Sequence, residues 1–185
     1  MRKSIVVIVG LCLMVSANAR AAENAKVTGT AKLTDAEIAY IYIQANQFDV
    51  EEAKLGIARG TAPEVKQHGE MVAKDHGGVI ASFEGLLTKQ GIEPTAPSGN
   101  APTVQQHQAV IDALKARSGA DFDREYLTEA IIAHRAFIAL VSETLLPDAR
   151  NPALASHLKE VLPAFKEHLS MTIEAAKKLD VSDAR

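Results

Sequence analysis

Three histidines stand on apolar helical stripes where aliphatic residues would pack more simply. His76 lies four residues after Val72, and His134 lies three after Ile131. His168 lies on the edge of a third stripe. A neutral imidazole binds zinc, copper or iron through one ring nitrogen, while a carboxylate orients the ring through the other. These residue types therefore predict a transition-metal site, with Zn, Cu or Fe as the ion.

Carboxylates that could complete such a site occur near these histidines. Asp75 directly precedes His76 and points to one flank of the same helix. Asp49, Glu51 and Glu52 cannot all face inward. Their spacing to neighbouring apolar residues favours Glu52 as the inward-facing carboxylate. The predicted ligand set is therefore His76, His134, His168, Glu52 and Asp75.

Core histidines also occur without any ligand. Such a histidine only hydrogen-bonds to a backbone carbonyl, a carboxylate or a water, because buried polar groups need partners. For one of these histidines alone this structural role is the commoner one, and the case for a site rests on three of them together. The remaining histidines, His68, His107 and His157, are expected to be solvated surface residues.

The elements that must position these residues are four long helices. The first runs from a capping box at 34–37 to Gly60, and the second from another at 61–64 to Gln90. The third covers about 120–146 and ends at Pro147. The fourth starts at 151–152, and Pro163 is expected to kink it. A short helix at about 104–117 lies in the connection between the second and the third.

The connections predict an all-α, ferritin-like four-helix bundle with one long crossover between helices two and three. Short loops make the first and second helices antiparallel, and likewise the third and fourth. Residues 91–119 are long enough to run the length of the bundle, so the second and third helices can be parallel. At about 1.5 Å per residue, His76 and His134 fall roughly 20 Å up the bundle, and His168 roughly 24 Å. The crossover topology thus predicts that the three imidazoles meet near mid-bundle.

A weak internal repeat accompanies this topology. Residues 61–68 and 150–157 each place a proline at the start of a helix, an apolar residue two later and a histidine five later. The pattern fits two related helical hairpins.

The N-terminus reads as a targeting segment. Residues 1–19 have a basic start, an apolar stretch and a small-residue cleavage pattern, so we expect a cleaved signal peptide; cleavage after Ala21 fits almost as well. A lipoprotein reading through Cys12 is weaker because Leu11 is large. The expected domains are this signal, a flexible leader at 20–32, the bundle at 33–180 and a polar tail at 181–185. The location is then the periplasm or cell envelope.

Charge and composition exclude several partners. Loss of Arg2 and Lys3 leaves 18 basic against 23 acidic residues, a formal net charge of −5. A mildly acidic chain without tryptophan argues against nucleic acid and anionic membranes as partners. No second apolar run approaches membrane-spanning length, so no stable membrane span is expected in the mature chain. A homo-oligomer or a protein of the envelope remains a candidate partner.

Enzyme motifs are missing where they would be expected. A di-iron carboxylate site needs Glu-x-x-His on two helices, but Ala73 and Phe165 stand three residues before His76 and His168. Nucleophile elbows, phosphate loops and zinc-protease motifs do not occur. The chain therefore leans away from enzymatic activity, with a redox or oxygen-activating metal enzyme as the open enzymatic alternative.

Several motifs together resemble a bacterial secreted family called domain of unknown function 4142. The resemblance covers about 34–179 and implies an exported ferritin-like bundle whose role is not established. In the family pattern the matching positions are Asp75, His76, His134 and His168, with an acidic residue near Glu51. Ala133 departs from the pattern, because the family often has aspartate there. The quoted motifs are Pro63-Glu64-Val65-Lys66, Met71-Val72, Asp75-His76, Asp121-Phe122-Asp123-Arg124-Glu125-Tyr126, His134, Leu162-Pro163 and Glu167-His168-Leu169.

Two functional hypotheses follow from the sequence. The first is an exported helical bundle that binds a transition metal or another small ligand at the mid-bundle histidines. The second is a non-catalytic envelope stress or interaction module whose histidines are structural. Metal dependence separates them.

Overall fold

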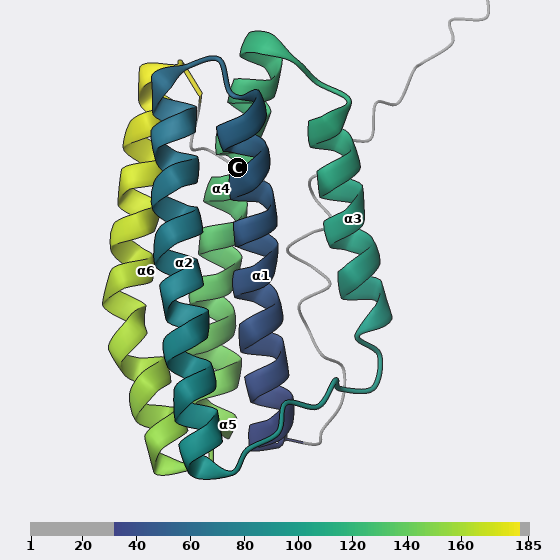
Figure 1. The fold of residues 1–185 in the computed structure, drawn as a ribbon, viewed down its shortest axis with the longest axis vertical. Coiled ribbons are helices and arrows are strands. Elements are labelled where there is room, and N and C mark those ends of the chain that lie inside the picture. Colours follow the sequence, from purple (N-terminus) through teal and green to yellow (C-terminus); the bar gives the residue numbers. More distant parts are fainter. Residues whose placement is uncertain (1–31, 182–185) are drawn as a thin grey trace, which may run out of the picture. The chain divides into compact units, whose positions relative to one another are not determined.

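The computed structural model describes residues 32–181, and within that range every regular element is helical (Figure 1). The predicted all-α helical bundle is confirmed. Its long helices are α1 (Asp35–Arg59), α2 (Pro63–Gln90), α4 (Gly119–Leu140) and α6 (Pro152–Lys178), and α3 (Ala101–Lys115) lies in the crossover between α2 and α4. The expected signal peptide at 1–19 lies outside the described residues, as do nearly all of the leader and of the tail.

Most helix ends follow the sequence signals. The capping box of α1 is formed, with the Thr34 side chain accepting from the Glu37 backbone and the Glu37 side chain accepting from the Thr34 backbone. Gly91 ends α2 with a φ of 65°, a left-handed conformation that favours glycine. Asn151 caps α6 by accepting from the backbone N–H groups of Ala153 and Leu154.

The predicted capping box at 61–64 is wrong. The N-cap of α2 is Ala62, and its side chain has nothing to accept with. Instead the Asp123 carboxylate of α4 accepts from the backbone N–H groups of Thr61 and Ala62, each at 2.9 Å, and from the Thr61 hydroxyl. A long-range carboxylate therefore caps α2 and joins the α1–α2 turn to α4.

The end of the third long helix also differs from the prediction. After Leu140 the chain makes a π-helical turn, Val141–Leu145, and then a short helix, α5 (Leu146–Asp148). The helical path therefore does not end before Pro147, and Pro147 lies within its last turn. It sits near the start of α5, where its missing N–H is best tolerated. Helix α6 is continuous through Pro163.

The long helices pack as two hairpins. Contacts join α1 to α2 and α4 to α6, and further contacts link α2 with α6 and α1 with α4. Helix α3 lies beside α1 at the edge of this bundle (Figure 1). It is anchored by two buried side chains, Ile111 and Leu114. The arrangement confirms a four-helix bundle whose crossover carries an extra helix.

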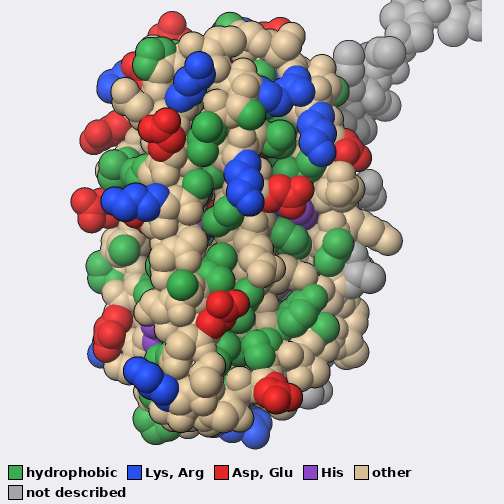
Figure 2. All heavy atoms as spheres, in the orientation of Figure 1, with side chains coloured by type: hydrophobic (Ala, Val, Ile, Leu, Met, Phe, Trp, Pro, Cys, Tyr) green, Lys and Arg blue, Asp and Glu red, His purple; other side chains and the backbone are tan. Residues whose placement is uncertain are grey.

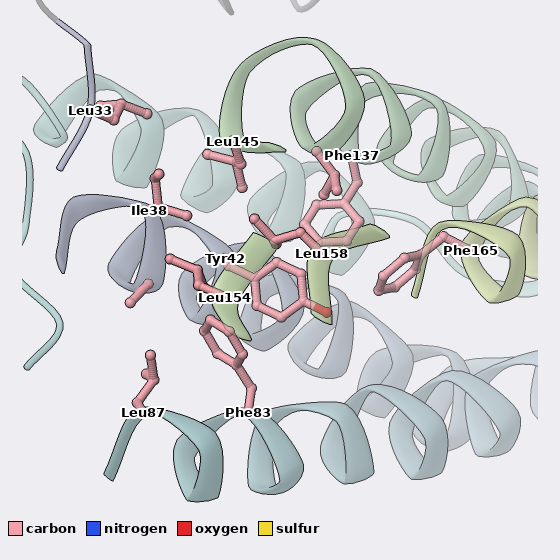
Figure 3. Packing of buried hydrophobic residues seen from close by; sticks show 12 residues of the cluster. Leu33, Ile38, Tyr42, Phe83, Leu87, Phe137, Leu145, Leu154, Leu158 and Phe165 are labelled. Atoms are coloured by element: carbon pink, nitrogen blue, oxygen red, sulfur yellow. The ribbon is translucent and has the colours of Figure 1, made fainter. Parts of the chain in front are cut away.

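The core consists of two apolar clusters with a polar layer between them. Tyr42, Phe83, Phe137 and Phe165 belong to one cluster, in which the aromatic rings face one another across the bundle (Figure 3). The other cluster includes Val65, Phe122, Leu127 and Ala176. Apart from Asp123, which caps α2, the buried polar residues of each long helix fall between the members of these clusters: Asn46, Asp49 and Glu52 on α1, His68 and His76 on α2, His134 on α4, and Thr172 on α6.

A glycine permits close packing beside this polar layer. A Cβ on Gly56 of α1 would lie 2.6 Å from Cζ of Tyr126 on α4, closer than non-bonded carbons approach. The absence of a side chain at Gly56 therefore lets the Tyr126 ring reach the bundle interior.

One helical run passes the length and composition test for a membrane span, contrary to the expectation that none would. This run, Gly119–Asp148, is 30 residues long. The core helix of a soluble bundle passes the same test, and one face of this run carries Phe122, Leu127, His134 and Phe137 into the bundle core.

Candidate metal centre

Three histidine side chains from three helices converge in the polar layer. One ring nitrogen each from His76, His134 and His168 lies within 4.8 Å of the other two. Nε2 of His76 and Nδ1 of His168 are 3.4 Å apart. His76 and His134 are buried, and His168 is partly buried. On the face drawn in Figure 2, histidine is visible only as small patches between other side chains. The structure therefore brings these three histidines together, as the sequence predicted.

Each ring has its outer nitrogen directed at an oxygen. Nδ1 of His134 lies 2.8 Å from the Ala130 carbonyl, which can only accept, so Nδ1 carries the hydrogen. Nε2 of His168 lies 3.3 Å from Oδ2 of Asp75. Nδ1 of His76 lies 3.2 Å from Oδ2 of Asp49, an ion-pair distance without an aligned hydrogen bond.

The inner nitrogens are left facing one another. Because Nδ1 of His134 donates its hydrogen, Nε2 of the same ring carries a lone pair. This buried Nε2 atom has no hydrogen-bond partner within residues 32–181. His168 donating to Asp75 likewise leaves a lone pair on Nδ1, which faces His76. A hydrogen on Nε2 of His76 completes a hydrogen bond to this lone pair, and a cation bound between the two nitrogens would take the place of that hydrogen.

Burial keeps two of the three rings neutral. It lowers the pKa of His76 to about 3 and that of His134 to about 4, with the neighbouring imidazoles contributing in the same direction. Burial also raises the pKa of Asp49 well above its usual value, and the nearby Glu52 adds to the shift. The cluster thus contains two uncharged imidazoles near neutral pH, those of His76 and His134, in the form that metals bind.

The carboxylate of α1 that contacts a histidine of the cluster is Asp49, whereas the favoured Glu52 also faces inward and lines a cavity with His134. The inner face of α1 follows Tyr42, Asn46, Asp49, Ala53 and Gly56, a small and polar stripe. The prediction instead used the apolar residues of α1, of which Ile41, Ala45 and Phe48 prove to be only partly buried. A search for any periodic stripe, polar or apolar, would have found Asp49. Glu52 is buried beside it but does not join the three histidine nitrogens.

His68 is buried, so its expected surface position is wrong. Its Nδ1 lies 2.9 Å from the Tyr126 hydroxyl, and its Nε2 lies 2.9 Å from Oγ1 of Thr172. Thr172 donates its own hydrogen to the His168 carbonyl at 2.7 Å, so it must accept from His68. His68 therefore carries its hydrogen on Nε2 and accepts from Tyr126. This chain of hydrogen bonds fastens the helix turn that bears His168.

His157 is half-buried, again contrary to the prediction, and the internal repeat explains its place. Its Nε2 lies 3.3 Å from the Tyr42 hydroxyl, with the rings edge to face. His68 and His157 hold equivalent positions in the repeat, and each meets a tyrosine of a long helix in the other hairpin. The repeated histidines therefore join the two hairpins at two levels.

His107, the third histidine expected on the surface, is also half-buried and links α3 to α1. Its ring stacks on Phe48 with centroids 3.9 Å apart. Its Nε2 lies 3.0 Å from Glu51, and its Nδ1 lies 3.4 Å from Glu52. Burial by itself lowers the pKa of His107, but hydrogen bonds and charges from Glu52 and Glu51 outweigh it, so the pKa is raised. Glu51 and His107 were outside the predicted set because only the fold brings α3 to this face.

The comparisons with known proteins place the chain in a family. Residues 17–175 match the family described as Domain of unknown function (DUF4142). The chain belongs to the DUF4142 family. A crystal structure of a DUF305 fragment from Deinococcus radiodurans has a TM-score of 0.65 to this DUF4142 chain at 15% identity, covering 80% of this chain and 99% of that one. At that identity the likeness shows the fold alone. Among curated proteins, no match is found.

Proposed function

We propose that this DUF4142 protein is an exported helical-bundle protein that holds one transition-metal ion between His76, His134 and His168. The observation that carries the proposal is the convergence of three imidazole nitrogens in a buried layer, each within 4.8 Å of the others. Burial keeps His76 and His134 neutral, so a cation meets no charge repulsion from these two rings.

The separation of two of these nitrogens supports a tetrahedral ion. Zinc binds imidazole nitrogen at about 2.0–2.1 Å, so two ligands of a tetrahedral zinc ion are about 3.4 Å apart. Nε2 of His76 and Nδ1 of His168 are 3.4 Å apart in the structure. The Nε2 atom of His134 completes three ligands and leaves one position for a water or another small ligand.

The groups around the three rings support the same reading. Metal-bound histidines usually hydrogen-bond through the other nitrogen to a carboxylate or a backbone carbonyl. Here Asp75 faces His168, the Ala130 carbonyl faces His134, and Asp49 faces His76. A cation bound at the inner nitrogens increases the acidity of the outer N–H groups and so strengthens these contacts.

The donor set favours borderline metals. Nitrogen ligands without thiolate suit Zn²⁺, Cu²⁺ and Fe²⁺, and the affinity of a given site rises from iron to copper. We expect Cu²⁺ to bind more tightly than Zn²⁺, and Zn²⁺ more tightly than Fe²⁺. A signal peptide would deliver the protein to the cell envelope, where such ions enter the cell.

Calorimetric titration of the demetallated protein tests the proposal. We expect one Zn²⁺ per chain, and we expect binding to vanish in a His76→Ala/His134→Ala double variant. A His157→Gln variant is the matched control, because this half-buried histidine lies outside the cluster and its loss is expected to leave binding unchanged. X-ray absorption of the loaded protein is expected to show imidazole nitrogens at about 2.0–2.1 Å.

Thermal unfolding distinguishes metal binding from a purely structural role of the three histidines. At a free Zn²⁺ concentration 100 times Kd, binding to the folded state adds about 2.7 kcal/mol to the free energy of unfolding. If the histidines only hold the bundle together, added metal leaves the melting temperature unchanged, while His134→Ala lowers stability by roughly 1–3 kcal/mol. That combination of results would reject metal binding and favour an interaction module.

A further inference from the structure

A second cluster of carboxylate and imidazole side chains lies between the surface and the three histidines. Glu51, His107 and Glu52 are in line, with contacts of 3.0 Å and 3.4 Å on the two sides of the His107 ring. The Glu51 side chain is 55% exposed and that of Glu52 only 11%. The cluster therefore begins at solvent and ends inside the bundle.

A small cavity continues inward from Glu52. Its walls include Glu52, Asp49 and His134, and about 10 Å³ of it is open to the centre of a water molecule. That is room for about one water or one ion with its nearest ligands. His134 carries the buried Nε2 that has no hydrogen-bond partner in the described part of the chain. Asp49, which also lines the cavity, has its Oδ2 3.2 Å from Nδ1 of His76.

Helix α3 supplies the middle of this line. Its His107 ring is held flat against Phe48, at an interplanar angle of 9°. Its C-terminal end is fixed by Arg59 of α1, whose guanidinium donates to the carbonyls of Lys115 and Arg117 at 3.0 Å and 2.6 Å. The crossover helix thus holds one imidazole between two carboxylates at the outer end of the cavity.

We propose that Glu51, His107 and Glu52 form an outer loading site through which a divalent transition-metal ion passes, by way of the Glu52–Asp49 cavity, to His76, His134 and His168. The inference rests on the proposed metal binding and adds the path by which the ion arrives. The path is built from oxygen and nitrogen donors at each step, so an ion exchanges its waters for protein ligands gradually.

The entrance of the path suits a cation. Glu51 is an exposed carboxylate at the entrance and attracts cations from solution, an effect that added salt screens. Glu52 supplies the next carboxylate, and Asp49, whose pKa is raised by burial, supplies the last oxygen ligands before the inner imidazoles. Loading rates of the wild-type protein are therefore expected to fall as ionic strength rises.

Stopped-flow measurement of Zn²⁺ loading and release in the full mature chain tests the path. We expect Glu51→Gln and His107→Gln to slow loading about ten-fold. A residue on the path but absent from the final site changes loading and release by the same factor, so Kd is expected to stay constant. Glu70→Gln is the matched control, because Glu70 is exposed on α2 and away from this cluster.

The possible results separate this inference from the proposed function. Tight Zn²⁺ binding with unchanged rates in both variants overturns the loading site and leaves the three-histidine centre standing. A change in Kd carried by release alone makes these residues final ligands and also overturns the path. If the wild-type protein binds no metal, both proposals fail. Because Glu51 is largely exposed, Glu51→Gln keeps the test valid even if His107→Gln loosens α3.

Discussion

Nδ1 of His168 and Nε2 of His76 lie 3.4 Å apart although 92 residues separate them in the sequence. The contact joins α2 to α6, one helix from each hairpin. Two imidazole nitrogens this close need a shared hydrogen or a shared cation. The same contact is therefore a structural link in the metal-free protein and one edge of a tetrahedral site in the proposed loaded protein.

The first prediction concerns the carboxylate that faces His168. Asp75 lies 3.3 Å from Nε2 of His168, and its side chain is 41% exposed. Replacing such an outer partner of a metal-bound histidine weakens metal affinity by about 10–100-fold. We expect Asp75→Asn to weaken metal affinity by about 10-fold, the lower end of this range, because solvent also reaches this carboxylate. Competition against a chelator of known affinity measures the change.

Glu70→Gln provides the control for charge. It removes the same formal charge from an exposed position of the same helix. An equal loss of affinity in both variants would mean that net charge, not the contact with His168, sets the effect.

The second prediction is a loss of stability in acid that depends on His68. Burial, with smaller contributions from His134 and His168, lowers the pKa of His68 to about 3, whereas the unfolded chain titrates near 6.5. Below pH 6.5 the unfolded state therefore binds the proton that the folded state does not. The contribution of neutral His68 is complete above pH 6.5 and is lost as pH falls toward 3, by up to about 1.4 kcal/mol per pH unit.

Urea unfolding of the wild type and of His68→Gln, both with chelator present, measures this effect. Glutamine does not titrate, so the stability difference between the two proteins is expected to shrink by about 2 kcal/mol from pH 7 to pH 5. A difference that stays constant over this range would show that His68 is not held neutral by the fold.

The third prediction concerns the carboxylate that caps α2. Asp123 is 3% exposed and accepts from the backbone N–H groups of Thr61 and Ala62. Asp123→Ala leaves both donors without this partner, and we expect a loss of about 2–3 kcal/mol in the free energy of unfolding. Asp121→Ala is the control, because this exposed acid pairs only with Arg124 within the described residues. Its loss is expected to cost less than about 1 kcal/mol. Equal costs in denaturant unfolding would refute the capping role.

Local signals in the sequence were enough for most of the secondary structure. The capping box at Thr34, the left-handed Gly91 and the Asn151 cap involve only residues a few positions apart, so they act before any tertiary contact forms. The cap of α2 was mispredicted for the opposite reason, and the end of α4 also differs from the prediction. Asp123 caps α2 across 62 residues, and a π-helical turn precedes Pro147.

The sequence also predicted which histidines meet. Helix lengths and loop lengths set the height of each residue, so the common level of His76, His134 and His168 followed from counting. Counting could not decide which face of α1 turns inward. Phe48 and Ile41 are more apolar than Asn46 and Asp49, yet the latter pair faces the core because the layer there is polar.

What the sequence by itself determined is the set of helices, their order, and the convergence of three histidines at one level. The tertiary structure alone decided their partners: Asp49 for His76, Tyr126 and Thr172 for His68, and the α3 imidazole of His107 for Glu51 and Glu52. The physical reason is that spacing along one helix fixes distances within that helix, whereas the rotation of each helix about its axis is set by packing against all the others.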